Sequence, residues 1–291
     1  MAAKNGLTFC ISAYLLWGVL PIYWKQMLHI SSFEILANRF IWSAVFTAFL
    51  IFISGQRGIF LAETKIILKS YRKILVLCAA SILIVFNWGI FIYAVNDGQI
   101  TATSMGYYIN PLVSVLLAVV FLKEKLNKRQ VCAVLFAICG IIFMVWHFKT
   151  LPWISLVLAF TFAFYGLIKK QLALSAMTSI FYESFLMTPF AALYEYFLSA
   201  KGGIYSVLTL RDLLLLIGCG AVTAIPMLFF TAGAKRISLK MLGFMQYIAP
   251  TISLLIGIFI YKEVFTIVHI ISFGCIWAGV LLFTLSQGAE A

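Results

Sequence analysis

Charged residues, and acidic ones above all, are scarce in this sequence. Lys, Arg, Asp and Glu make up 10% of the 291 residues, and only nine residues are acidic. Soluble globular domains are about 25% charged and about 45–50% apolar, whereas this chain is 64% hydrophobic, with a mean hydropathy of +1.08. The composition excludes a soluble enzyme and a disordered or fibrous chain, and it is typical of a membrane protein.

Sequence motifs for catalysis and metal binding are absent as well. The chain contains no H-E-x-x-H, G-x-S-x-G, C-x-x-C or G-x-x-x-x-G-K-[ST] pattern and no paired aspartates. The six cysteines and three histidines stand singly, so we expect neither a zinc site nor a disulfide framework. Without a phosphate-binding loop, the chain is not expected to hydrolyse ATP by itself. We therefore expect no metal, no cofactor and no enzymatic activity.

Long apolar runs fill most of the sequence. A membrane-spanning helix needs about 20 apolar residues, and about 28 residues per pass with its loop give roughly ten passes in this length. The first run lacks a small-residue cleavage site, so we expect it to stay as a helix and not to be removed as a signal peptide. We predict an all-α membrane protein with ten transmembrane helices, at 6–28, 34–54, 74–95, 100–122, 129–148, 152–173, 177–199, 212–234, 240–261 and 266–286.

The linker at 55–73 is long compared with the others. It carries five basic residues, one acidic residue and two apolar clusters, Ile59–Leu61 and Ile66–Leu68. This spacing suits a helix that lies on the cytoplasmic membrane surface. A solvated loop is the alternative.

Lys and Arg are distributed unevenly along the chain. With a cytoplasmic N-terminus, fifteen of them fall in cytoplasmic segments and five in outer loops, while Arg39 lies within a helix. Cytoplasmic loops of membrane proteins carry an excess of Lys and Arg. We therefore attribute the net charge of +12 to topology and not to nucleic-acid binding. The prediction is a multi-pass protein of the cytoplasmic (inner) cell membrane with both termini in the cytoplasm.

The two halves of the chain resemble each other. Trp17 corresponds to Tyr165 at an offset of 148 residues, and Glu34 corresponds to Glu183 at an offset of 149. Later residues recur 139 positions on: Tyr108-Ile-Asn-Pro111 as Tyr247-Ile-Ala-Pro250, Lys123-Glu124 as Lys262-Glu263, and Gly140 as Gly279. We predict two five-helix repeats, 4–148 and 151–287. Because five is odd, the second repeat is inverted in the membrane, as in many secondary transporters; a duplication without transport is the alternative.

An ordered set of sequence motifs runs through both halves of the chain. The motifs are Ala13-Tyr-Leu-Leu-Trp-Gly18, Tyr23-Trp-Lys25, Glu34-Ile-Leu-Ala-Asn-Arg39, Asn87-Trp88, Gly106-Tyr-Tyr-Ile-Asn-Pro111, Phe164-Tyr-Gly-Leu-Ile-Lys169 and Gln246-Tyr-Ile-Ala-Pro-Thr251. In these motifs the chain resembles the drug/metabolite transporter superfamily in its EamA branch, and most closely the RarD-type proteins. This resemblance implies ten helices, a central cavity between helices 1–4 and 6–9, and helices 5 and 10 at the periphery.

Three charged residues within the predicted helices, Glu34, Arg39 and Glu183, are candidates for function. Charged side chains at membrane depth face the protein interior or water, because exposure to lipid is costly. The planar guanidinium of Arg39 suits a carboxylate, so it is a candidate site for an anionic or zwitterionic ligand group. The alternative is a static ion pair with Glu34 or Glu183. Glu183 would either carry a proton during transport or pair with Arg39.

Pro111 and Pro250 are predicted to fall in the middle of the fourth and ninth helices. Proline frees the carbonyl four residues earlier, here that of Tyr107 or Gln246. Irregular backbone at this depth is buried in protein or lines a cavity. We interpret both prolines as hinges lined by ligand, with fixed kinks as the alternative. Further polar and aromatic candidates for the substrate pathway are Trp17, Asn87, Tyr107, Asn110, Tyr165, Gln246 and Tyr247.

These patterns favour a secondary transporter that moves a small organic molecule, such as a metabolite, an amino-acid-like compound or a drug, by alternating access. The substrate, the direction of transport, proton coupling and the oligomeric state stay open at this point. Small-residue stripes, Ala133-x-x-x-Ala137 and Cys275-x-x-x-Gly279, suit helix packing within one chain or between two. A non-transporting sensor or scaffold is the first alternative, although little chain is left for an output domain. A membrane-embedded enzyme is the weaker one.

Overall fold

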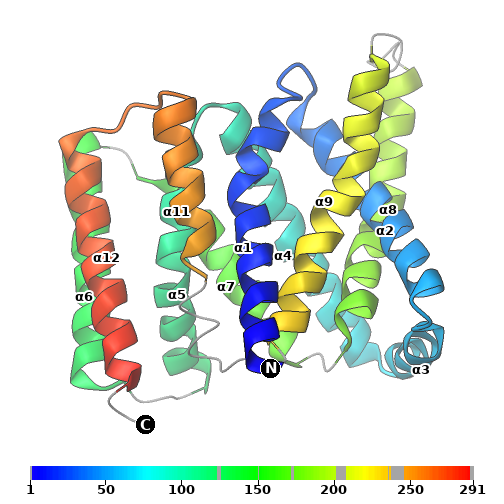
Figure 1. Ribbon diagram of the computed structural model, residues 1–291, viewed down its shortest axis with the longest axis horizontal. Coiled ribbons are helices and arrows are strands. Elements are labelled where there is room, and N and C mark those ends of the chain that lie inside the picture. Colours follow the sequence, from blue (N-terminus) through cyan, green and yellow to red (C-terminus); the bar gives the residue numbers. More distant parts are fainter. Residues whose placement is uncertain are drawn as a thin grey trace.

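The computed structural model describes residues 2–122, 126–149, 151–171, 174–200, 208–234, 236 and 246–288. Within these ranges the protein is all-helical and contains no strand. The long helices lie side by side and roughly parallel or antiparallel (Figure 1). They are α1 (Ala2–Lys25), α2 (Ser32–Ile53), α3 (Arg57–Leu68), α4 (Tyr71–Asn96), α5 (Ile100–Leu122), α6 (Lys128–Phe148), α7 (Trp153–Gln171), α8 (Ala176–Ala200), α9 (Leu210–Ala234), α11 (Ile248–Leu255) with the π-helical turn Ile256–Ile260, and α12 (Ile267–Gly288).

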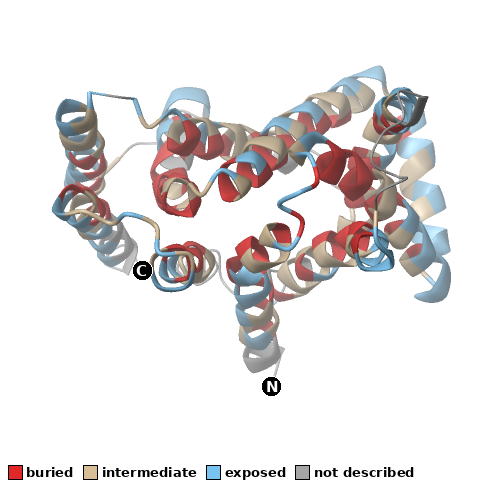
Figure 2. Ribbon diagram, turned by 90° about the horizontal axis from the view of Figure 1, so that it is seen from above, coloured by how far each residue is buried: buried red, intermediate tan, exposed pale blue. Residues whose placement is uncertain are grey.

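Five of the described helices are long and apolar enough to cross a membrane, judged by length and composition. They contain the segments Gly6–Lys25, Ser32–Ile53, Tyr71–Asn96, Lys128–Phe148 and Leu210–Phe230. Buried residues face the middle of the molecule and exposed residues lie mainly on its outside (Figure 2). Many of these exposed side chains are large and apolar, which is expected for a chain surrounded by lipid. The all-helical, membrane-protein character predicted from the composition is therefore confirmed.

The predicted surface helix is present as α3, so the alternative of a solvated loop at 55–73 is wrong. The α3 helix lies at one end of the bundle (Figure 1) and is docked against α8. Its Glu63 carboxylate accepts hydrogen bonds from the backbone N–H and the hydroxyl of Ser175, each at 2.7 Å. Tyr182 donates to the Thr64 hydroxyl at 2.8 Å. Ser175 directly precedes α8, so Glu63 satisfies backbone donors that the helix itself leaves unpaired.

Helices α6 and α12 pack on each other at one end of the molecule (Figure 1), which agrees with the peripheral position that the family resemblance implies. Small residues make the close approach possible. A Cβ atom added at Gly140 would lie 2.8 Å from the Ser272 carbonyl oxygen, and one at Gly279 would lie 2.6 Å from the Ala133 carbonyl oxygen. The glycines of the small-residue stripes thus serve the packing of α6 and α12 within one chain, and packing between two chains stays open.

Three of the helix contacts join elements that hold the same place in the two predicted repeats: α2 with α8, α5 with α11, and α6 with α12. Residue pairs follow the same pattern. Tyr108 and Tyr247, which are 139 positions apart, stack with ring centroids 6.0 Å apart and an interplanar angle of 15°. Corresponding helices of the two halves thus pack on each other in three places, from the α6–α12 pair at one end of the molecule to the α2–α8 pair towards the other (Figure 1).

The two predicted hinge prolines occupy different helical positions. Pro111 lies inside α5, as predicted. The prediction that Pro250 lies mid-helix is wrong, because α11 begins at Ile248 and its first helical hydrogen bond runs from the Thr251 N–H to the Tyr247 carbonyl at 3.2 Å. The first N–H groups of a helix have no partner within it, so proline there removes nothing. The start of the predicted ninth helix, 240–245, lies outside the described residues.

Candidate functional site

Arg39 lies where four helices converge. It is contributed by α2 and is only 4% exposed. Its Nε–H donates to the Thr223 hydroxyl of α9 at 2.9 Å. Its guanidinium carbon lies 3.7 Å from the ring centroid of Trp88 on α4 and 5.1 Å from that of Trp24 on α1. A cation close to an aromatic ring is attracted by the electrons of the ring. We call Arg39, Trp24, Trp88 and Thr223 the arginine cage.

No carboxylate of the described residues forms an ion pair with the arginine cage. Among the described residues, Arg39 forms no ion pair with Glu34 or Glu183, so the alternative prediction of a static ion pair is wrong. The Nη1 atom of Arg39 is buried without a hydrogen-bond partner, and so is the Nε1 atom of neighbouring Trp24. Buried donors of this kind are rare and costly. The cage therefore presents two buried N–H donors next to a positive charge.

Glu34 lies on the same helix as Arg39 and is fully buried. Neither of its carboxylate oxygens has a hydrogen-bond partner in the described part of the chain. The Asn38 amide donates to the Glu34 carbonyl at 3.1 Å and to the Glu195 carboxylate at 2.8 Å. Asn38 therefore joins the backbone of α2, at Glu34, to the Glu195 carboxylate of α8.

Glu195 was missed by the sequence analysis. It lies in α8 within the predicted segment 177–199 and is 8% exposed. An acidic residue inside an apolar segment is by itself a signal for function. It went unnoticed because the position that matches it in the first repeat is not acidic.

Glu183 is the counterpart of Glu34, and its carboxylate has hydrogen-bond donors. It accepts from the Tyr165 hydroxyl at 2.7 Å and from the Ser179 hydroxyl at 2.8 Å. The structure thus brings together two residues that the sequence singled out separately. Glu183 itself is 3% exposed, so these hydroxyl groups replace water around the carboxylate.

Asn87 and Tyr107, both predicted for the substrate pathway, also come together. The Asn87 amide donates to the Leu158 carbonyl at 3.0 Å and to the Thr161 hydroxyl at 2.9 Å, and its oxygen accepts from the Tyr107 hydroxyl at 3.2 Å. These bonds join α4, α5 and α7. The polar atoms of Asn87 are therefore engaged within the protein.

The remaining candidates are spread over the helices near the middle of the molecule. Tyr108 hydrogen-bonds to the Thr251 hydroxyl, which itself donates to the Tyr247 carbonyl at 2.7 Å. Asn110 is buried beside Pro111, and Gln246 lies in the turn before α11. Trp17 packs against Tyr14 and Phe230, with ring centroids 5.5 and 5.6 Å away. In the described part of the chain, Arg39 has its hydrogen-bond and ring contacts with Thr223, Trp24 and Trp88 and not with these residues.

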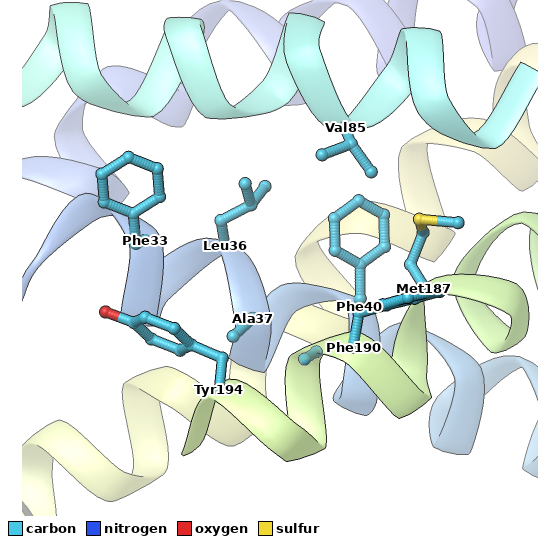
Figure 3. Close-up of a pocket in the computed structure, with 9 residues that line it drawn as sticks. Phe33, Leu36, Ala37, Phe40, Val85, Met187, Phe190 and Tyr194 are labelled. Carbon is cyan, nitrogen blue, oxygen red and sulfur yellow. The ribbon is translucent and has the colours of Figure 1, made fainter. Parts of the chain in front are cut away.

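An apolar cavity of about 140 Å³ lies between α2, α4 and α8 (Figure 3). Phe33 and Phe190 are exposed, so the cavity opens at the outside of the bundle. Phe40 lines it, and the Phe40 ring stacks on Trp88 with centroids 5.5 Å apart. Two aromatic rings therefore separate the cavity from the guanidinium of Arg39. The lining residues are Phe33, Leu36, Ala37, Phe40, Val85, Met187, Phe190, Ala191 and Tyr194.

Comparison with known proteins assigns the chain to a family. The profile of the EamA-like transporter family matches twice, at residues 4–146 and 151–285. The uncharacterized transporter YojE of Bacillus subtilis (strain 168) is 43% identical over 98% of this chain and 95% of its own length. Protein RarD of Escherichia coli (strain K12) is 38% identical over 97% of this chain and 94% of its own length.

A solved crystal structure has the same fold, with a TM-score of 0.63 over 97% of this chain and 98% of that chain, at 16% identity. The family profile and the two relatives also extend over nearly the whole sequence. The family profile and the relatives support a membrane transporter. The chain belongs to the EamA-like transporter family.

Proposed function

We propose that the chain is a secondary transporter that moves a small organic molecule across the cytoplasmic membrane by alternating access. One observation carries the proposal: within a transporter family, four helices from both halves of the chain meet at a buried arginine with unused donors. A charge at this depth is costly, and charged residues inside membrane helices therefore mark sites of binding or transport.

Two inverted five-helix repeats, 4–148 and 151–287, provide the mechanism of this proposal. The family profile matches twice in tandem, and corresponding helices pack on each other. In this proposal the chain crosses the membrane ten times, and α11 with its π-helical turn forms the ninth transmembrane helix. Two related halves of opposite orientation can exchange their conformations, which opens the central site to either side of the membrane.

The orientation follows from the charges at one end of the bundle. Helix α1 begins, helix α12 ends and α3 lies at the same end (Figure 1). The α3 region carries Arg57, Lys65 and Lys69. The excess of basic residues supports a cytoplasmic position for this end and for both termini. The hydrophobic side chains of α3 that stay exposed, such as Leu61 and Leu68, would contact the membrane surface.

A counterflow assay in proteoliposomes tests the proposal. Vesicles loaded with one unlabelled compound are offered the same compound in labelled form, with amino acids, organic acids and chloramphenicol as the panel. A transporter accelerates exchange of at least one compound class relative to protein-free vesicles. No acceleration with any class would contradict transport and favour a membrane sensor or scaffold.

A further inference from the structure

The arginine cage contains two unpartnered N–H donors that point to the same kind of ligand. Arg39 Nη1 and Trp24 Nε1 are both buried without an acceptor among the described residues. They come from two helices that follow one another in the chain, α1 and α2, and the Arg39 guanidinium carbon lies 5.1 Å from the centroid of the Trp24 ring. Buried donors are rarely left without an acceptor, and the arginine cage contains two of them.

The charge of the cage determines the nature of that acceptor. Arginine stays protonated in proteins, and the described residues supply it with no carboxylate. The stack on Trp88 at 3.7 Å occupies a face of the guanidinium, while the Nε edge is bonded to Thr223. The Nη1 N–H groups in the guanidinium plane remain for hydrogen bonding. A planar anion such as a carboxylate matches these donors in charge and in shape.

We propose that Arg39 and Trp24 together bind the anionic group of the transported molecule, which is a small carboxylate or a zwitterion with an apolar body. This inference rests on the proposed transport function. The apolar body follows from the surroundings, because the rings of Trp24 and Trp88 lie next to the Arg39 guanidinium. In the described arrangement Arg39 is enclosed, so the ligand reaches it when the helices around the cage separate during the transport cycle.

A binding assay on the purified full chain in detergent tests this inference. Acetate, phenylacetate and phenylalanine are each compared with the matching amide, namely acetamide, phenylacetamide and phenylalaninamide. Each pair differs in the charge of one group. We expect at least one carboxylate, with phenylacetate or phenylalanine favoured, to raise the thermal unfolding midpoint in a dose-dependent way, while its amide does not. Equal responses to every acid and its amide would overturn the proposal.

Two matched variants locate the binding group. Trp24→Phe keeps an aromatic ring beside Arg39 and removes only the indole N–H and the second ring. Trp88→Phe makes the same change on the other side of the guanidinium. Loss of a hydrogen bond to a charged group weakens binding about tenfold or more, so we expect Trp24→Phe to lower carboxylate affinity by that factor and Trp88→Phe to lower it clearly less. Equal losses would show that only the aromatic rings matter and would contradict the role of the Trp24 N–H.

Arg39 variants separate charge from shape. Arg39→Gln removes the charge and is expected to abolish the preference for acid over amide. Arg39→Lys keeps the charge without the planar fork and should retain a reduced preference. If Arg39→Gln, folded as judged by size-exclusion chromatography, still prefers the acid, the anion binds elsewhere and the proposal fails.

The outcome is separable from that of the proposed function. Exchange of neutral or cationic compounds alone in proteoliposomes, with no acid preference in binding, would leave transport standing and overturn the anion site. Acid binding that depends on Arg39, without exchange of any compound, would leave the site standing and overturn transport.

Discussion

The two halves of the chain have an acidic residue at matching positions, but the hydrogen bonding of the two carboxylates differs. In the second half, Glu183 accepts hydrogen bonds from Tyr165 and Ser179. In the first half, Glu34 is buried and its carboxylate oxygens have no partner among the described residues. The matching aromatic positions differ as well, because Tyr165 bonds to Glu183 through its hydroxyl, whereas Trp17 packs against Tyr14 and Phe230.

A second matching pair shows the same difference. Arg39 in α2 corresponds to Thr188 in α8 at the offset of 149 residues that relates Glu34 to Glu183. The Thr188 hydroxyl donates to the Ser184 carbonyl of its own helix at 2.9 Å, whereas Arg39 keeps an unpartnered donor. The fold repeats, yet the unsatisfied polar chemistry is concentrated on α2. The first half is therefore expected to carry the binding and coupling chemistry, and the second half to serve mainly as its structural counterpart.

The largest expected effect comes from comparing Arg39 with Thr188. Arg39→Gln removes a charge whose hydrogen bonds would hold the ligand, which is expected to slow exchange in proteoliposomes by about tenfold to a hundredfold. Thr188→Val keeps the shape of the side chain and loses only a bond within α8, so exchange should stay near the wild-type rate. Similar losses in both variants would contradict a functional difference between the halves.

An intermediate effect is expected from the two glutamates. In Glu34→Gln the amide mimics a protonated carboxyl, so the protein should fold and exchange ligand but lose accumulation driven by a pH gradient. Glu183→Gln places an amide N–H₂ group against one of two hydroxyl donors, which is expected to cost about 1–3 kcal/mol of stability. Uptake at two pH gradients and thermal unfolding in detergent measure the two effects. Loss of pH-driven uptake in Glu183→Gln alone would move the coupling site to the second half.

The helical architecture was predictable from the sequence, because apolar runs of membrane length and a charge bias along the loops are properties of composition. The partners of the charged residues were not. The sequence places Arg39, Glu34 and Glu183 on helices, but it does not say which faces meet. Arg39 contacts Trp24 and Trp88, and both tryptophans stood in the quoted motifs without a reason to prefer them over a carboxylate.

The internal repeat was informative about the fold and misleading about local chemistry. It pointed to Glu183 as the counterpart of Glu34, and for the same reason it passed over Glu195, which lacks an acidic counterpart. It also suggested equal roles for Pro111 and Pro250. The two halves differ in where a helix starts and in single hydroxyl groups. The packing of the whole bundle determines these local differences, and the internal repeat of the sequence does not reveal them.

The smallest expected effect concerns these two prolines. Pro111 interrupts the hydrogen bonding of α5 from within, so Pro111→Ala restores a backbone donor to the helix interior. Proline there is up to about 3 kcal/mol less favourable than alanine in a helix on its own, and neighbouring helices offset part of this in a membrane protein. The variant is therefore expected to unfold at a higher temperature and, if α5 bends during the transport cycle, to exchange ligand more slowly.

Pro250 supplies the matched control. It precedes the first helical hydrogen bond of α11, where proline is tolerated because no helical partner is lost. Pro250→Ala should therefore change the unfolding temperature and the exchange rate less than Pro111→Ala does. A higher unfolding temperature without slower exchange in Pro111→Ala would show that the α5 kink is static. An equal slowing in both variants would show that the two halves bend alike despite the different positions of their prolines.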